Sequence, residues 1–404
     1  MVLGSNTINF LNYIYHFIIG RMLGPAGYGE LVSLISIIGI FGTIPASLGL
    51  VIIKYVSAAR TKEEIDNLVG WIKEKTFQIS VLIFLCILFL SPAVTSFLHI
   101  TRLDYLILIA ISYLFSLSSG FNRSILQGLL KFKEMVFSVL VESSFKLILS
   151  IVLVYLGFFV GGAIFAATIA CVLGWFLTGI YLKKYHKKNI TQPENIKALI
   201  SFIFPALIQT VSVTLLYSSD VVLVKHFFSS HDAGIYGSLS NLGKVIFFGA
   251  SPISAVMFPL VSKRYSSGDT YSRIFSYSLI LTLLFSVVIT LLYWVLPEVA
   301  INSLYGFAYL EAKGLLVWFG VFMSLFTLSS LVINLCLSLG KVKVIILPLI
   351  AAAAQILGIW LFHNNLFTVI LVSIIITTLL LLSLLIYSVY IGVLFNSPKL
   401  TRWR

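Results

Sequence analysis

The chain has 404 residues, of which 59% are hydrophobic and only 10% are charged, and its mean hydropathy is +1.07. Soluble domains carry about 25% charged residues, so a soluble protein is excluded and an all-α polytopic membrane protein is predicted. The net charge of +13 is dispersed over short segments rather than gathered on one face, which argues against a nucleic-acid partner.

Apolar runs between charged or Gly/Pro residues predict twelve membrane-spanning helices. We expect them at residues 3–23, 31–53, 76–99, 103–129, 135–157, 160–182, 198–228, 233–262, 275–297, 311–338, 344–363 and 366–394. Three cysteines, Cys86, Cys171 and Cys336, lie singly in separate runs. We therefore expect no disulfide framework, no metal site and no cofactor.

The distribution of Lys and Arg predicts the orientation. With the N-terminus inside, twenty of the 27 basic residues fall on the cytoplasmic side, and only Arg21, Arg102 and Lys313 fall in outer loops. Because positive charge accumulates on the cytoplasmic side, both termini are expected in the cytoplasm, with the chain in the plasma (inner) membrane.

The loops between the predicted spans are short. The longest, residues 54–75, mixes charged and apolar residues and is expected to form an interfacial helix. Residues 183–197 follow six spans and are the expected cytoplasmic linker between an N-terminal lobe, 1–182, and a C-terminal lobe, 198–404. Because no loop is long enough to fold a soluble catalytic domain, an enzyme is not expected.

Two short stretches indicate an internal repeat. "LGPAGYGE" (23–30) and "HDAGIYGS" (231–238) place Tyr28-Gly29 and Tyr236-Gly237 208 residues apart, and "LLKFKEM" resembles "LGKVKVI" at a similar offset. With six spans in each half, the halves are expected to be parallel copies, with a substrate path between them near the midplane. Gly and Pro suit outer hairpin turns, and Tyr28 and Tyr236 are expected as interfacial anchors.

Six ionisable residues besides histidine lie inside predicted spans, where each is costly unless it is paired or reaches the interface. Three of them are Arg123, Glu142 and Lys146. Arg123 is near enough to an interface to snorkel, so its role in a cavity stays open. Glu142 and Lys146 are four residues apart on one helical face and could neutralise each other or line a cavity.

The other three are Asp220, Lys225 and Lys244. Lys225 could also snorkel. Asp220 and Lys244 could form a structural pair across neighbouring helices, or Asp220 could be a proton or cation site that Lys244 modulates.

The four cations outnumber the two carboxylates, and a cavity with surplus positive charge suits phosphate or pyrophosphate. The predicted substrate-binding cations are Arg123, Lys146, Lys244 and Lys225, and the candidates for ion coupling are Asp220 and Glu142. A polar lumen is predicted at Asn6, Asn9 and Asn12, whose spacing of three puts them on one helical face. His16 beyond them is expected to be a neutral, hydrogen-bonded histidine.

Three runs of residues resemble a known family. They are "IIGRMLGPAGYGELVSLISIIGIFGTIPASLGL", "RSILQGLLKFK" followed by "VESSFKLIL", and "SSDVVLVKHFFSSHDAGIYG". In this order and spacing, from near Met1 to about Lys343, they resemble the polysaccharide transporter family of lipid-linked oligosaccharide flippases, the O-antigen flippase type. The resemblance implies the multidrug/oligosaccharidyl-lipid/polysaccharide exporter fold, with two six-helix lobes around a central cavity. It also implies cationic cavity residues, among which Arg123 matches by its place in "RSILQG".

The resemblance implies a function as well. Family members move a polyprenyl-(pyro)phosphate-linked oligosaccharide from the cytoplasmic to the outer leaflet by alternating access. The expected partners are the lipid-linked glycan, the bilayer, a proton or sodium counter-ion and other glycan-assembly membrane proteins. The lipid II flippase branch usually has more spans than are predicted here, which argues against that branch. The alternative is a cation-coupled multidrug or small-molecule exporter of the same fold, which would need surplus carboxylates.

Overall fold

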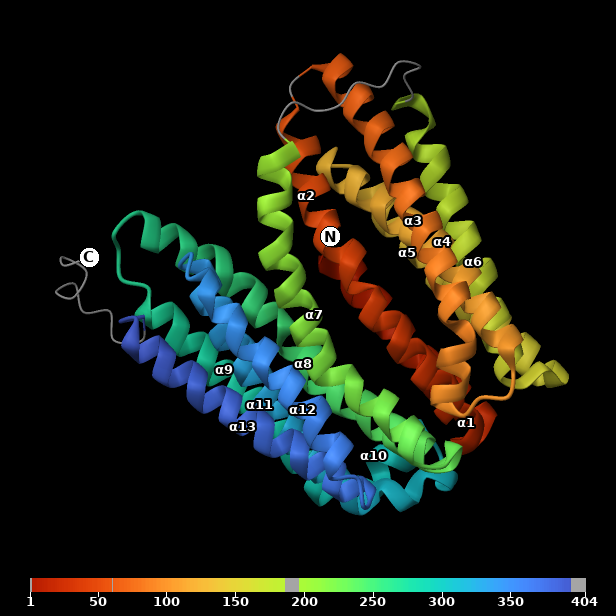
Figure 1. Ribbon diagram of the computed structural model, residues 1–404. Helices are drawn as coiled ribbons and strands as arrows, with labels where there is room; N and C mark the ends of the chain where they lie inside the picture. Colours follow the sequence, from red (N-terminus) through yellow and green to blue (C-terminus); the bar gives the residue numbers. More distant parts are fainter. Residues whose placement is uncertain (1, 60, 186–195, 394–404) are drawn as a thin grey trace. The chain divides into compact units, whose positions relative to one another are not determined.

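The computed structural model describes residues 2–59, 61–185 and 196–393 (Figure 1), and all regular structure in those ranges is helical. The longer helices are α1 (Val2–Phe41), α2 (Thr43–Ala58), α3 (Lys62–Leu98), α4 (Leu103–Gly128), α5 (Phe132–Leu153), α6 (Phe159–Leu182), α7 (Ile196–Phe227), α8 (Ser230–Ser266), α9 (Ser272–Val295), α11 (Lys313–Ser338), α12 (Ile346–Leu361) and α13 (Leu366–Tyr390). The short ones are η1 (Val154–Phe158), η2 (Lys183–Tyr185), α10 (Pro297–Leu304), η3 (Phe307–Ala312) and η4 (Val342–Ile345). The predicted all-α fold is confirmed.

Ten segments of the described chain are long and apolar enough to cross a membrane. Two of them hold two passes each. Gly24, with φ 68°, interrupts the segment Thr7–Phe41. Gly157, with φ 89°, interrupts the segment Phe132–Tyr185. Glycine adopts such positive φ values without a steric cost, so at each position two helices are joined across a kink. The ten segments therefore account for the predicted twelve passes, and the chain is a multi-pass membrane protein.

The predicted loop at residues 54–75 is wrong. Helix α2 runs to Ala58, and α3 begins at Lys62 with Thr61 as its N-cap, whose side-chain oxygen accepts the Glu64 N–H at 3.1 Å. The charged segment that was expected as a separate interfacial helix is therefore the first part of α3, which begins four residues after α2 ends.

The chain divides into two compact units. Unit 1 comprises residues 1–211 and 228–234, and unit 2 comprises residues 212–227 and 235–404. The division falls inside α7. Of the predicted linker, residues 183–185 form η2, and residues 186–195 lie outside the described part of the chain.

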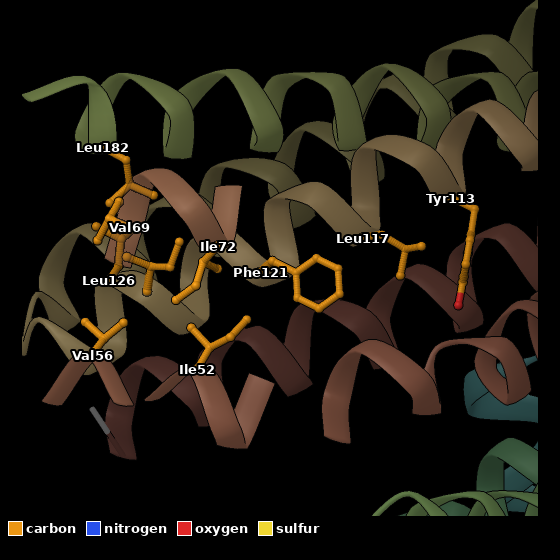
Figure 2. Packing of buried hydrophobic residues seen from close by; sticks show 10 residues of the cluster. Ile52, Val56, Val69, Ile72, Tyr113, Leu117, Phe121, Leu126 and Leu182 are labelled. Atoms are coloured by element: carbon orange, nitrogen blue, oxygen red, sulfur yellow. The ribbon is translucent and has the colours of Figure 1, made fainter. Parts of the chain in front are cut away.

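Unit 1 has an apolar core where α2, α3, α4 and the end of α6 meet (Figure 2). Its buried members are Ile52, Val56, Val69, Ile72, Tyr113, Leu117, Phe121, Ile125, Leu126 and Leu182. Phe121 and Ile125 lie on either side of Arg123 along α4, at 1% and 0% exposure. Packing of these two side chains into the core fixes the rotation of α4, so Arg123 points toward α5.

In unit 2, α11 packs against α9 and α13, and α12 packs against α13. Hydrogen bonds attach α7 and α8 to this group. The Gln355 amide on α12 donates to the Leu216 carbonyl at 3.0 Å, and the Tyr293 hydroxyl on α9 donates to the Leu242 carbonyl at 2.7 Å. Helices α7 and α8, which carry the ionisable residues of this unit, are therefore held by polar as well as apolar contacts.

Candidate functional site

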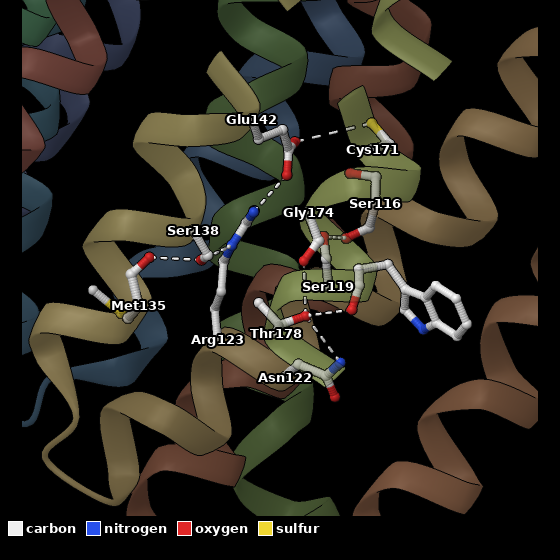
Figure 3. Close-up of polar contacts among 11 residues, drawn as sticks. Ser116, Ser119, Asn122, Arg123, Met135, Ser138, Glu142, Cys171, Gly174 and Thr178 are labelled. Atoms are coloured by element: carbon white, nitrogen blue, oxygen red, sulfur yellow. Dashed lines mark hydrogen bonds and ion pairs between the residues drawn. The ribbon is translucent and has the colours of Figure 1, made fainter. Parts of the chain in front are cut away.

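A salt bridge between α4 and α5 lies at the centre of the polar cluster in unit 1 (Figure 3). Arg123 donates through Nη2 to the Glu142 carboxylate and through Nε to the Ser138 hydroxyl at 3.2 Å. The two charged side chains are only 16% and 17% exposed. Arg123 therefore does not snorkel to the interface, and Glu142 is neutralised by Arg123 rather than by Lys146 as its spacing suggested.

Gly174 on α6 makes room for this salt bridge. A Cβ at this position would overlap Oε2 of Glu142 and lie 2.9 Å from Nη2 of Arg123. Figure 3 shows Gly174 beside the pair, and Cys171 one turn earlier on α6 approaches Oε1 of Glu142 with its thiol at 3.9 Å. The pair is thus enclosed by three helices, α4, α5 and α6.

Lys146 contacts two residues of α1 instead of Glu142, the partner suggested by its position four residues away on α5. Its ammonium donates to the side-chain oxygen of Asn12 on α1 at 2.9 Å and lies 4.4 Å from the centroid of the Tyr15 ring. Within the described chain, no carboxylate lies within ion-pair distance of Lys146. Its positive charge is held by neutral groups, an amide oxygen and an aromatic face.

A cavity of about 200 Å³ adjoins this lysine. Its lining includes Tyr15, His16, Glu142, Lys146 and Cys171. The volume suits a small anion or several waters, and it is too small for an oligosaccharide. Of the predicted asparagine stripe, Asn12 bonds Lys146, Asn9 is exposed, and the Asn6 side chain lies outside the described residues.

Unit 2 contains a buried carboxylate on α7. Asp220 is 0% exposed and accepts hydrogen bonds from the Tyr236 hydroxyl at 2.8 Å and from the Val221 N–H at 2.9 Å. Lys244 on α8 lies 5.5 Å from the centroid of the Tyr217 ring, and no ion pair joins it to Asp220 in the described chain. Of the two alternatives for this pair, the structural salt bridge between Asp220 and Lys244 is therefore not formed, and the ion site at Asp220 stays a prediction.

Lys225 is buried on the same helix. Its exposed fraction is 2%, so the alternative in which it snorkels to the interface is wrong. It lies in unit 2, whereas Arg123 and Lys146 lie in unit 1. Of the four predicted cations, Arg123 and Lys146 therefore lie in unit 1, and Lys225 and Lys244 lie in unit 2.

The sequence profile of a family described as "Polysaccharide biosynthesis protein" matches residues 1–265. The chain belongs to this family. An uncharacterized membrane protein of Methanocaldococcus jannaschii is 28% identical over 274 residues, which cover 62% of this chain. The matched region spans 63% of that relative's length.

Solved structures share the fold of this family member. An inward-facing multidrug resistance MATE family transporter of the MOP superfamily has a TM-score of 0.76 at 14% identity, over 95% of each chain. The lipid II flippase MurJ in an inward closed conformation has a TM-score of 0.75 at 15% identity, over 96% of this chain and 88% of that one. At these identities the likeness shows the fold, which is the one expected from the sequence.

Two tyrosines of this family member have roles that the sequence did not predict. Tyr28 and Tyr236, expected as interfacial anchors, are both 0% exposed. The Tyr28 hydroxyl lies 3.2 Å from Nδ1 of His16, and the Tyr236 hydroxyl donates to Asp220. Each hydroxyl therefore contacts a titratable side chain on the preceding pass of its own unit. The equivalent positions of the two tyrosines in the repeat could have indicated these buried contacts, because a residue found in both copies can have the same buried contact in each.

Proposed function

We propose that the chain is a flippase that moves a polyprenyl-(pyro)phosphate-linked oligosaccharide from the cytoplasmic to the outer leaflet by alternating access. It lies in the plasma (inner) membrane with both termini in the cytoplasm. Membership of the polysaccharide biosynthesis family supports the glycan part of this proposal. The fold shared with transporters, one of them a lipid II flippase, supports the transport part.

The observation that carries the proposal is the environment of Lys146. A lysine within a span has a free-energy cost unless its charge is paired, so an unpaired one indicates a functional site. Here the ammonium bonds an amide oxygen and faces an aromatic ring beside a small cavity. A phosphate oxygen can replace the Asn12 oxygen and form a stronger, charge-assisted hydrogen bond. The anionic part of the carrier lipid is therefore proposed to bind at Lys146.

Arg123 is proposed as the second contact for the carrier. Its Nη2 and Nε atoms donate to Glu142 and Ser138, and a guanidinium has five N–H donors, so those of Nη1 are available to a phosphate. Glu142 then keeps the guanidinium in place rather than binding substrate. Lys244 and Lys225 are proposed as cationic contacts in unit 2.

The proposed counter-ion site is Asp220. This carboxylate is fully buried and hydrogen-bonded, yet no cation lies within ion-pair distance of it in the described chain. A proton or a sodium ion can therefore bind this carboxylate directly, where no lysine or arginine forms an ion pair with it. The gradient of that ion drives the return of the empty transporter in this scheme.

A binding experiment separates this function from the multidrug exporter, whose fold is the same. Purified protein in detergent is titrated with a short-chain polyprenyl pyrophosphate carrying one sugar, and separately with a lipophilic cationic dye. We expect the Kd of the pyrophosphate to be at least about tenfold lower than that of the dye. A tenfold ratio of Kd corresponds to about 1.4 kcal/mol, which is less than the contribution of one charge-assisted hydrogen bond. Tighter binding of the dye would overturn the flippase in favour of the cation-coupled exporter.

A further inference from the structure

A second cavity lies in unit 1, between α3, α4 and α6. Its volume is about 520 Å³, which is in the range of small-molecule sites. It shares no lining residue with the cavity at Lys146. The mechanism proposed above makes no use of it.

One end of this cavity is cationic. Lys73, in the first part of α3, and Lys183, directly after α6, both line it, and no carboxylate is among the described residues that do so. The described chain shows no ion pair for either lysine. Their positions agree with the packing of the end of α6, through η2, against α3. Two ammonium groups therefore face one space without an anion.

The polar groups deeper in the cavity leave the lysines as its main donors. The hydroxyls of Thr76 and Ser118 donate to the carbonyls of Ile72 and Leu114, at 2.7 Å and 2.9 Å. Asn122 uses one amide N–H on Thr178, at 3.1 Å, and keeps a second. The two ammonium groups are thus the charged donors that an anion would meet in the cavity, with the Asn122 amide and the Trp175 indole as neutral ones.

The rest of the lining is apolar and exposed. Phe77, Phe176 and Ile180 line the cavity with 48%, 57% and 51% of their surface exposed. On α3 the exposed apolar surface continues with Leu82 and Phe89, at 62% and 84%. Such a surface on a membrane protein faces hydrocarbon chains. The cavity therefore joins a cationic end to a surface suited to acyl chains.

We propose that this cavity binds an anionic phospholipid of the bilayer, with its phosphate at Lys73 and Lys183 and its acyl chains along α3 and α6. Basic pockets between membrane helices recognise anionic headgroups by this combination of charge and apolar contact. The bound lipid is a resident of the membrane, distinct from the transported glycan. With the orientation proposed above, this lipid belongs to the cytoplasmic leaflet, and that assignment alone rests on the proposed function.

The test compares two lipids with the same acyl chains. Dioleoyl phosphatidylglycerol and dioleoyl phosphatidylcholine are titrated on the full-length protein in detergent, and bound lipid is counted by native mass spectrometry. We expect the anionic lipid to bind about tenfold more tightly, and the Lys73→Ala/Lys183→Ala variant to lose this preference to within about twofold. The Lys73→Gln/Lys183→Gln variant, which removes both charges but keeps a long polar side chain at each position, should behave in the same way if the alanine variant does not fold.

The matched control is Lys75→Ala. Lys75 lies two residues from Lys73 on α3, is exposed and donates to the Gln78 side chain, and it does not line the cavity. This variant should keep the wild-type preference for the anionic lipid. A double variant that keeps that preference, or a wild-type protein that binds both lipids equally, would overturn the proposal.

Two further ligands identify the source of the phosphate. Inorganic phosphate at the same concentrations should not displace the anionic lipid. Displacement would show that the cavity binds free phosphate, which would overturn the lipid proposal. The short-chain polyprenyl pyrophosphate should bind the double variant as it binds the wild type. A parallel loss of its binding would mean that the cavity takes the transported substrate, which would overturn the resident-lipid proposal while leaving the flippase proposal in place.

Discussion

Charge neutralisation inside the spans depends on residues that are far apart in the sequence. Glu142 bonds Arg123, 19 positions away, and Lys146 bonds Asn12, 134 positions away. An i,i+4 ion pair contributes only about 0.2–0.5 kcal/mol on a helix surface. A hydrogen bond to a charged group contributes about 1.5–3 kcal/mol. The sequence therefore predicted which charged residues lie inside the spans, but not which of them would be neutralised.

The two carboxylates inside the predicted spans are expected to differ in transport. Glu142 is paired with Arg123, whereas Asp220 has hydrogen-bond donors and no cation at ion-pair distance in the described chain. We predict that an imposed proton or sodium gradient accelerates wild-type transport and leaves Asp220→Asn transport unchanged. The measurement is the rate of glycolipid flipping in proteoliposomes with and without each gradient.

Glu142→Gln is the matched variant for this comparison. This variant removes the carboxylate that holds the Arg123 guanidinium in place, so it should lower the rate of transport. It leaves Asp220 unchanged, so transport should still respond to the gradient. A wild-type protein that ignores both gradients would remove Asp220 as the coupling residue. So would an Asp220→Asn variant that responds like the wild type.

At the scale of the helix, Gly174 determines whether α6 can approach the salt bridge between α4 and α5. We predict that Gly174→Ala destabilises the protein by about 1–3 kcal/mol, because the added methyl overlaps the Glu142 carboxylate and side chains must shift. Thermal unfolding in detergent, followed by circular dichroism, measures the change as a lower midpoint.

Gly120→Ala is the control for Gly174→Ala. Gly120 lies one turn before Arg123 on α4, and a Cβ there would meet no atom within 4 Å. Because alanine favours a helix by about 1 kcal/mol over glycine, this variant should unfold at the same temperature or higher. Equal midpoints for both alanine variants would show that the salt bridge adjusts without cost.

The helices themselves were predicted well, and their bounds less so. Apolar runs located every pass, because a span must satisfy its own backbone hydrogen bonds in lipid. The error at residues 54–75 arose because α3 extends beyond its apolar part. Its 37 residues are about 55 Å long, which exceeds the roughly 40–45 Å of a whole bilayer. Hydropathy detects the part of a helix in hydrocarbon and not the charged turns that continue into water.

At the scale of the molecule, the repeat and the family resemblance led to the fold, and the fold is confirmed by its solved relatives. The boundaries of the lobes at residues 182 and 198 stay a prediction. The buried contacts of Tyr28 and Tyr236 were missed because interfacial anchoring is the usual role of a tyrosine beside a turn. Their partners, His16 and Asp220, become visible only when the preceding pass is placed beside the turn.

Transport of an anionic glycolipid is the central claim, and flipping in vesicles tests it most directly. Protein is reconstituted with a polyprenyl-pyrophosphate-linked oligosaccharide, and arrival at the opposite leaflet is followed by an added glycosidase. We predict that wild-type protein and Lys75→Ala flip the glycolipid far faster than protein-free vesicles do. Lys146→Ala should be slower than wild type by about tenfold or more, because it loses a charge-assisted hydrogen bond to the phosphate. Wild-type vesicles that flip no faster than empty ones, or a Lys146→Ala rate equal to wild type, would contradict the account.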